Sequence, residues 1–183
     1  MDRDAALKLC RKRAEKETTV RHLISVEGVM RALAHRFSED EDLWALTGLF
    51  HDLDQDQTHD DPDRHAYLAA EWLREAGVDE RVVNGVLAHA HEQFRTDRMS
   101  KAVVNADAVA GLLVAAALVR PEKAVGMKVA SVKKKLKEKA FAPGVNRDEV
   151  TSVEDSIGLP LDEFLAVGIE GLQAVAPEIG LAP

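Results

Sequence analysis

Six histidine and aspartate residues of this chain carry the nitrogen and oxygen donors that divalent metal ions bind. They are His22, His51, Asp52, His65, His89 and Asp107. Each lies in or at the end of a segment whose apolar residues recur with a helical period, in register with the inward face. Burying several such groups separately would be very costly, and a shared cation removes that cost. The pattern therefore predicts a buried site for one or two divalent ions.

The types of donor narrow the choice of metal. Nitrogen and oxygen ligands without thiolate suit Fe, Mn, Co, Zn, Ni or Mg rather than copper or an iron–sulfur cluster. Cys10 is the only cysteine, so a thiolate cluster is excluded and a reducing, cytoplasmic setting is expected. Neighbours on a helix point about 100° apart, so His51 and Asp52 share an ion only near a helix end, where Asp52 can also bridge two ions. The alternative for any single histidine is a core side chain bonded to a backbone carbonyl.

The elements that must position these residues are expected to be helices. Apolar residues make up 46% of the chain and aromatic residues only 4%, a composition that favours an all-α core of Leu, Val and Ala. We found no alternation typical of strands. Helices are expected over residues 4–16, 19–37, 39–54, 62–77, 79–92, 100–120 and 127–141, with two more starting at Asn146 and Pro160.

Several helix starts are predicted from capping residues. Ser38 and Glu41 form a capping box before the third helix, Asp61 and Pro62 begin the fourth, and Ser100 begins the sixth. The sequence QDQTHD is expected to be a loop. The apolar segment 102–119 is interrupted by polar residues, so it predicts a buried core helix and no membrane span.

The length of 183 residues fits a single domain. We expect a metal-binding core over residues 18–120 and a helical extension over residues 121–183 that packs on it. The extension carries an apolar stripe, from Phe164 to Leu172, that packs on the core or on a second subunit, so a homo-oligomer is possible.

The charge balance bears on the partners. A formal net charge of −8 argues against general nucleic-acid binding and against an anionic membrane surface. A small phosphorylated ligand held by local cations remains compatible with it. The candidate phosphate-binding residues are Lys133, Lys134, Lys137 and Arg120, although a run of lysines on a helix is also typical of a solvated face. The N-terminus of the helix that begins at Pro62 is a second candidate anion site.

The order of the metal-binding candidates resembles a known family. His22, then His51-Asp52, then Asp107 is similar to the H…HD…D signature of the HD superfamily of metal-dependent phosphohydrolases. His65 and His89 match the two extra histidines of its binuclear members, such as bacterial hydrolases of dinucleoside tetraphosphates. The runs ADAVAGLLVAAALVRP and SVKKKLKEKAFAPGVNRDEV resemble a subgroup of small bacterial HD hydrolases, so the resemblance extends from about residue 20 to residue 172. In place of the HDIGK of many members this chain reads HDLDQ, and Gln55 replaces a lysine that often helps to hold phosphate.

The resemblance implies an all-α helical bundle of the HD-domain type, with extra C-terminal helices, that hydrolyses a small phosphate ester such as a nucleotide with a metal-activated water. The principal ion would be held by His22, His51, Asp52 and Asp107. His65 and His89 would hold a second ion or contact the substrate phosphate, and His91 could protonate the leaving oxygen, so that Asp52, His65, His89 and His91 form the catalytic set. Two alternatives stay open: a di-iron oxygenase of the same fold and a non-catalytic regulatory module that binds metal.

Overall fold

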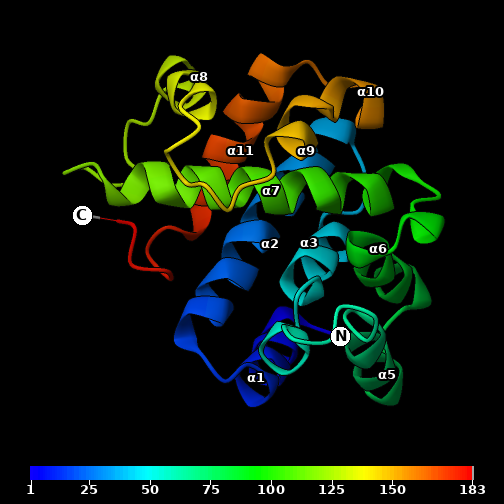
Figure 1. Ribbon diagram of the computed structural model, residues 1–183. Helices are drawn as coiled ribbons and strands as arrows, with labels where there is room; N and C mark the ends of the chain where they lie inside the picture. The colour runs from blue at the N-terminus through cyan, green and yellow to red at the C-terminus, as the bar shows by residue number, and fades with distance from the viewer. Residues whose placement is uncertain (183) are drawn as a thin grey trace.

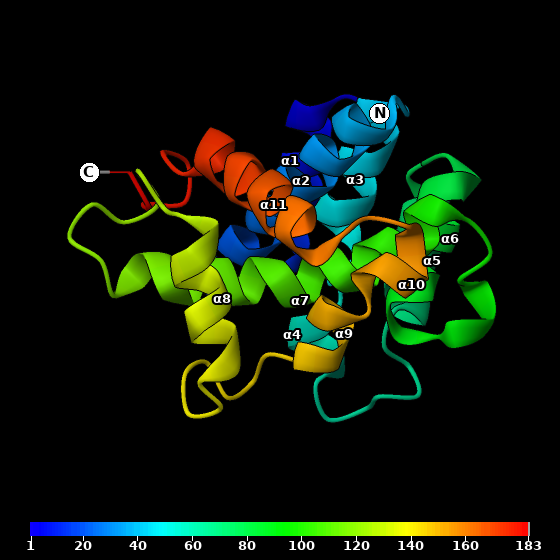
Figure 2. The same ribbon diagram turned by 90° about the horizontal axis from the view of Figure 1, so that it is seen from above.

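The computed structural model describes residues 1–182, and over that range it contains helices and no strands, so the all-α prediction is confirmed. Figures 1 and 2 show the arrangement. The helices are α1 (Arg3–Arg13), α2 (Glu17–Phe37), α3 (Glu41–Phe50), α4 (Gln55–Thr58), α5 (Tyr67–Glu75), α6 (Glu80–Ala90), the short 3-10 helix η1 (Glu92–Phe94), α7 (Arg98–Leu118), α8 (Val129–Lys137), α9 (Arg147–Thr151), α10 (Val153–Ile157) and α11 (Leu161–Val175).

Two long helices form the centre of the bundle. α2 packs against α3 on one side and α11 on another, and it also contacts α7. α7 runs across the whole molecule in Figure 1, with α6 against one end and α8, α9 and α10 placed along it. The C-terminal helices α8, α9 and α10 thus pack on α7, which also contacts α2, α3 and α6.

The sequence of α7 explains its central place. Small and branched apolar residues occupy most of its positions, and it is long and apolar enough to cross a membrane. However, 67% of its most apolar window is buried inside the protein, which is typical of a core helix. Asp107 lies in the middle of this helix, so a carboxylate is carried into apolar surroundings.

The start of α3 differs from the prediction. Ser38 is not its N-cap but the C-cap of α2, in the left-handed conformation with φ of 57°. The N-cap of α3 is Asp40, whose carboxylate accepts hydrogen bonds from the backbone N–H groups of Asp42 and Leu43 at 3.1 and 3.0 Å. An aspartate at the N-cap satisfies the free N–H groups of the first turn, and the predicted capping box with Ser38 was wrong.

The start of α5 also differs, for a tertiary reason. The helix begins at Tyr67 rather than Pro62, after Ala66 with φ of 66°. The backbone N–H of Ala69, in the first turn, donates to Asp54 Oδ2 at 2.9 Å, so a carboxylate from another part of the chain caps this helix. The predicted anion site at a helix N-terminus beside Pro62 is therefore absent.

Part of the predicted QDQTHD loop is helical. Residues 55–58 form α4, and Asp56 on it ties α4 to the connection between α1 and α2. Its carboxylate accepts hydrogen bonds from the backbone N–H groups of Glu15 and Lys16 at 2.7 and 3.1 Å, and from the Thr19 hydroxyl at 3.0 Å. These hydrogen bonds therefore attach the segment after α3 to the connection between α1 and α2.

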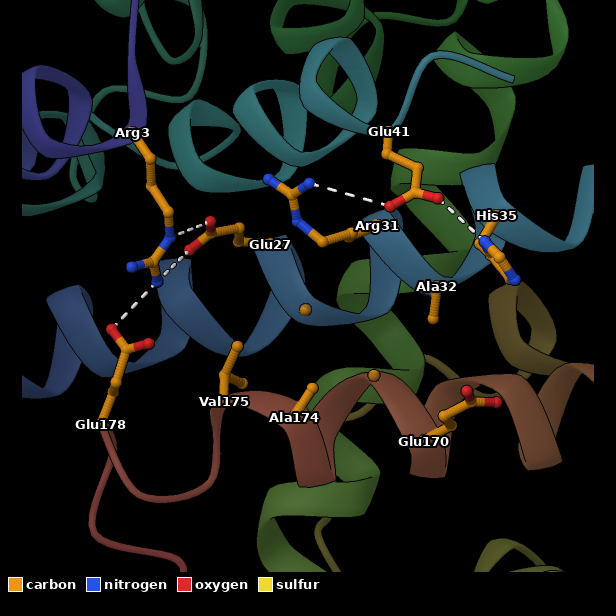
Figure 3. Close-up of a pocket in the computed structure, with 12 residues that line it drawn as sticks. Arg3, Glu27, Arg31, Ala32, His35, Glu41, Glu170, Ala174, Val175 and Glu178 are labelled. Atoms are coloured by element: carbon orange, nitrogen blue, oxygen red, sulfur yellow. Dashed lines mark hydrogen bonds and ion pairs between the residues drawn. The ribbon is translucent and has the colours of Figure 1, made fainter. Parts of the chain in front are cut away.

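Glycines allow α2 and α11 to pack in backbone contact. A Cβ atom at Gly28 would lie 2.5 Å from the carbonyl oxygen of Gly171. Figure 3 shows the hollow beside this crossing. In it Arg3 Nη2 donates to Glu27 and to Glu178, both at 2.9 Å. The side chain of Glu27 is only 2% exposed. This ion-pair group joins α1 to the end of the chain and neutralises the buried Glu27 carboxylate.

The crossing predicts a stability effect. The substitution Gly28→Ala should lower the free energy of unfolding by about 2 kcal/mol or more, because the nearest neighbouring atom is the backbone carbonyl oxygen of Gly171, which cannot rotate away. Gly111→Ala on α7 is the control, since its Cβ would meet only Val145 Cγ2 at 3.4 Å and alanine favours the helix by about 1 kcal/mol. Urea denaturation of both variants measures the difference. Equal stabilities would contradict the close packing of the two helices.

Candidate metal centre

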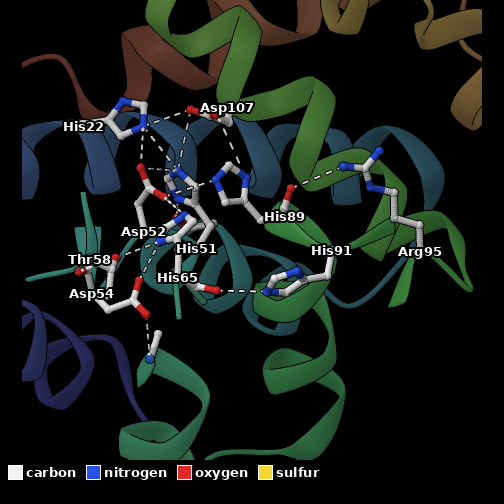
Figure 4. Close-up of polar contacts among 12 residues, drawn as sticks. His22, His51, Asp52, Asp54, Thr58, His65, His89, His91, Arg95 and Asp107 are labelled. Carbon is white, nitrogen blue, oxygen red and sulfur yellow. Dashed lines mark hydrogen bonds and ion pairs between the residues drawn. The ribbon is translucent and has the colours of Figure 1, made fainter. Parts of the chain in front are cut away.

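The six residues named from the sequence converge on one point between the central helices (Figure 4). Each comes from a different position in the fold: His22 from α2, His51 at the end of α3, Asp52 in the turn after it, His65 just before α5, His89 from the last turn of α6, and Asp107 from α7. Residues separated by up to 85 positions in sequence therefore meet because α2, α3, α6 and α7 pack together.

One group of ligand atoms joins α2, α3 and α7. His22 Nε2 lies 2.9 Å from Asp107 Oδ1 and 3.2 Å from His51 Nε2, and His51 Nε2 lies 3.6 Å from the same carboxylate oxygen. These three atoms are close enough together to coordinate one ion. The two imidazole nitrogens face each other, so one of them must carry a proton or both must share a cation.

A second group of ligand atoms surrounds Asp52. Its Oδ1 lies 3.2 Å from His65 Nε2 and 3.1 Å from His89 Nε2, whereas its Oδ2 lies 3.8 Å from His51 Nε2 and 4.0 Å from His22 Nε2. The two oxygens of one carboxylate thus face two different pairs of histidines. Oδ1 is fully buried and has no hydrogen bond of acceptable geometry despite these short contacts.

Hydrogen bonds behind the cluster fix the direction of two rings. His51 Nδ1 donates to the carbonyl oxygen of Gly48 at 2.8 Å, and His65 Nδ1 lies 2.9 Å from Asp54 Oδ1 and 3.1 Å from the Thr58 hydroxyl. When Nδ1 is the donor, Nε2 presents its lone pair to the cluster. A histidine whose other nitrogen is held by a carboxylate or carbonyl is the usual arrangement for a metal ligand.

Asp54 is the functional residue that sequence reasoning missed. It is fully buried, and its two oxygens divide between His65 and the first turn of α5. The signal was present in the run HDLD, where a second carboxylate two residues after Asp52 also lies in an apolar context.

The histidines of the cluster keep its two carboxyl groups ionised. Burial opposes the ionisation of Asp52, but His51, His65 and His89 outweigh it and hold the pKa of this carboxyl well below its usual range. Burial likewise opposes ionised Asp107, and His22 and His51 hold its pKa below the usual range. Both carboxylates therefore stay ionised at any physiological pH, which is the form that binds metal.

The same contacts raise the pKa values of two imidazoles in the cluster. Burial disfavours a charged His65, yet Asp52 and Asp54 raise its pKa to about 10. The pKa of His51 is also raised, with burial opposed by Asp52 and Asp107. In the metal-free protein protons thus neutralise the carboxylates, and a bound cation would take their place.

His91 does not join the cluster. Its Nε2 hydrogen-bonds to the backbone carbonyl oxygen of His65 at 2.9 Å, and its ring packs against Tyr67 with the ring centroids 4.3 Å apart. Figure 4 shows its ring turned away from the other imidazoles. His91 thus lies outside the cluster with its Nε2 engaged by a backbone carbonyl, and its role as a general acid stays a prediction.

The predicted phosphate-binding cations lie elsewhere in the fold. Arg120 lies just after α7 and 13 residues beyond Asp107, which corresponds to about 20 Å along the helix axis. There its guanidinium donates to the carbonyl oxygens of Lys123 and Val125 at 3.0 and 2.9 Å. Lys133 pairs with Asp162 at 2.6 Å. Lys134 and Lys137 are exposed on α8. The structure does not bring these four residues to the cluster, so the solvated-face reading suits the lysines better.

The comparisons with known proteins agree with this site. A family model described as HD domain matches residues 19–123, which is more than half of the chain. The curated protein Ribonuclease Y 2 of Levilactobacillus brevis is 30% identical over 90 residues, which cover 49% of this chain and 17% of that protein. The chain thus spans about one sixth of the length of that relative. No solved structure matches the chain.

An all-helical bundle with His22, His51-Asp52 and Asp107 directed to one point is the arrangement of an HD-type protein, and these side chains could hold a metal ion. The chain belongs to the HD domain family, whose superfamily comprises metal-dependent phosphohydrolases. The resemblance drawn from the H…HD…D order is therefore confirmed.

Proposed function

We propose that this protein is a cytoplasmic phosphohydrolase that uses one or two divalent metal ions to hydrolyse a small phosphate ester, with a nucleotide as the favoured substrate. The observation that carries the proposal is the position of Asp52, whose two oxygens face two separate pairs of histidines. A buried carboxylate oxygen without a hydrogen bond, 3.1 and 3.2 Å from two imidazoles, is well suited to a cation.

The ligands would divide between two ions. His22, His51, Asp107 and Asp52 Oδ2 would hold one, and His65, His89 and Asp52 Oδ1 would hold the other. When bound, such ions supply a nucleophilic hydroxide near neutral pH and neutralise the phosphoryl oxygens. Gly48 and Asp54 keep the Nδ1 protons of His51 and His65, so that each Nε2 serves as a ligand.

A di-iron oxygenase remains the second candidate, because the same bridging position of Asp52 suits two irons. The alternative of a regulatory module with a structural ion would use the same ligands without turnover. The ribonuclease named in the comparison acts as a much longer protein, and the charge of −8 on this chain does not favour RNA.

A screen of metal-loaded protein tests the proposal. Purified protein with Mn, Co, Mg or Fe is incubated with nucleoside monophosphates, sugar phosphates, phosphodiesters, dinucleoside polyphosphates and a short RNA, and phosphate release is measured. An anaerobic iron-loaded sample is assayed for oxygen uptake in parallel. We expect metal-dependent release from a phosphate ester. Oxygen consumption with a substrate, or strong stabilisation by metal with no turnover of any ester, would overturn the proposal.

A further inference from the structure

A cavity of about 360 Å³ opens on the metal centre from the side of α7 and α9. Its lining includes two residues of the cluster, His22 and Asp107, together with Gly111, Gly144, Asn146 and Glu149. The volume is in the range of small-ligand pockets. A phosphate at the metal centre would therefore have the rest of its molecule in this cavity.

The charges around the cavity are negative. Asp107 and Glu149 contribute carboxylates, and no lysine or arginine is among the residues that line it. Glu149 is half-buried, and burial together with the neighbouring Asp107 raises the pKa of its carboxyl, opposed by His89 and Arg95. With Asp107 holding a metal ion, a second phosphate group placed here would still meet the Glu149 carboxylate, and no lysine or arginine lines this cavity to bind it, which disfavours it.

The wall that carries Glu149 is held in place. Arg147 donates to the backbone carbonyls of Leu136 at 3.0 Å, Glu138 at 3.1 Å and Val145 at 3.2 Å, so one guanidinium fixes the segment that leads into α9. The side-chain amide of Asn105, on α7, donates to the backbone oxygen of Glu149 at 2.6 Å. Glu149 is thus presented to the cavity by a fixed backbone, which favours specific binding.

A second hollow meets the first at His22 and Gly111. It has a volume of about 240 Å³, and its lining is mainly apolar, with Val114, Leu118, Ile179 and Leu181 beside Arg21. A leaving group that reaches both hollows would have hydrogen-bond donors near Glu149 and a flat or apolar part near α7 and the C-terminal residues. A nucleoside has this division between its ribose and its base.

We infer that Glu149 binds the leaving group of the substrate, accepting hydrogen bonds from its hydroxyl or amino groups, and that the site selects nucleoside monophosphates over di- and triphosphates. This inference rests on the proposed function, because it assumes that the phosphate lies at the metal centre. In this arrangement the cavity next to the metal centre selects the substrate, while the metal centre itself binds the phosphate.

Binding of uncleavable analogues tests the inference separately from turnover. The probes are methylphosphonate, a 5′-methylenephosphonate of adenosine and the diphosphate analogue of that compound, titrated calorimetrically into manganese-loaded protein. We expect the nucleoside phosphonate to bind most tightly. Glu149→Gln should weaken its binding by about tenfold or more, because a neutral amide oxygen accepts a hydrogen bond more weakly than a carboxylate oxygen, and should leave the affinity for methylphosphonate within about twofold.

Asp148→Asn is the matched control, since Asp148 is exposed on the same short helix and does not line the cavity. It should leave all three affinities unchanged. If the diphosphate analogue binds as tightly as the monophosphonate, or if Glu149→Gln weakens none of the probes, the inference is wrong while the phosphohydrolase proposal stands. If no phosphonate binds even with metal present, both are wrong.

Discussion

Replacing Asp52 by alanine should lower the phosphohydrolase kcat/KM by at least about 1,000-fold and remove metal from the protein. Both candidate ions lose a ligand at once, because each oxygen of Asp52 faces a different pair of histidines. Loss of an outer partner of a metal ligand already lowers affinity or activity by about 10–100-fold, so a shared ligand should have a larger effect. The measurements are kcat/KM on the best substrate and metal content by mass spectrometry.

The control for this variant is Asp60→Ala. Asp60 is an exposed aspartate in the same connection, and its recorded ion pair is with the exposed His59 at 3.0 Å. It should keep full metal content and full activity. Circular dichroism of both variants checks that the fold is retained. An Asp52→Ala protein with unchanged turnover and two bound metals would show that Asp52 is not a ligand.

The helices and the inward direction of the key residues could be predicted from periodicity. Asp107 illustrates why: a carboxylate surrounded by apolar residues on every side of a long helix must be buried wherever that helix packs. His22 and His89 followed from the same reasoning applied to α2 and α6. The convergence of these residues needed only the assumption that several inward faces share one core.

Contacts between distant segments could not be predicted in the same way. Asp54 caps α5 from a different part of the chain and orients His65, so the local signals of Asp61 and Pro62 were overridden. Neither capping residues nor periodicity reports such a bond, because both are properties of neighbouring residues. The position of Arg120 could not be predicted for a related reason, since its charge does not say how far from the cluster, which meets the middle of α7, this residue lies.

The alternating aspartates 52, 54 and 56 show how one short segment supports the site. Asp52 faces the imidazoles, Asp54 holds His65 and the start of α5, and Asp56 holds the connection that leads into α2. α2 in turn carries His22. The turn after α3 therefore holds His65 directly and supports the helix that carries His22. These contacts offset the cost of desolvating the buried carboxylates.

The charge state of His65 predicts opposite pH dependences for metal binding and for metal-free stability. Its pKa is raised to about 10 by Asp52 and Asp54 despite burial, so folding of the metal-free chain takes up a proton above the unfolded value of about 6.5. The stabilisation is complete below about pH 6.5 and is lost as the pH rises toward 10. Urea denaturation in the presence of a chelator should therefore show falling stability between pH 7 and pH 9.5.

Metal binding must displace this proton, so its dependence on pH has the reverse sign. If one proton leaves for each metal bound, the apparent association constant rises about tenfold per pH unit between pH 6 and pH 8.5. Competition with a calibrated chelator measures the slope. Asp54→Asn should flatten both dependences, because it removes one of the two carboxylates that raise the pKa of His65, whereas Asp60→Ala should change neither. A metal affinity independent of pH in this range would mean that no ligand is protonated in the metal-free protein, and the contacts of Asp52 with His65 and His89 would then require another explanation.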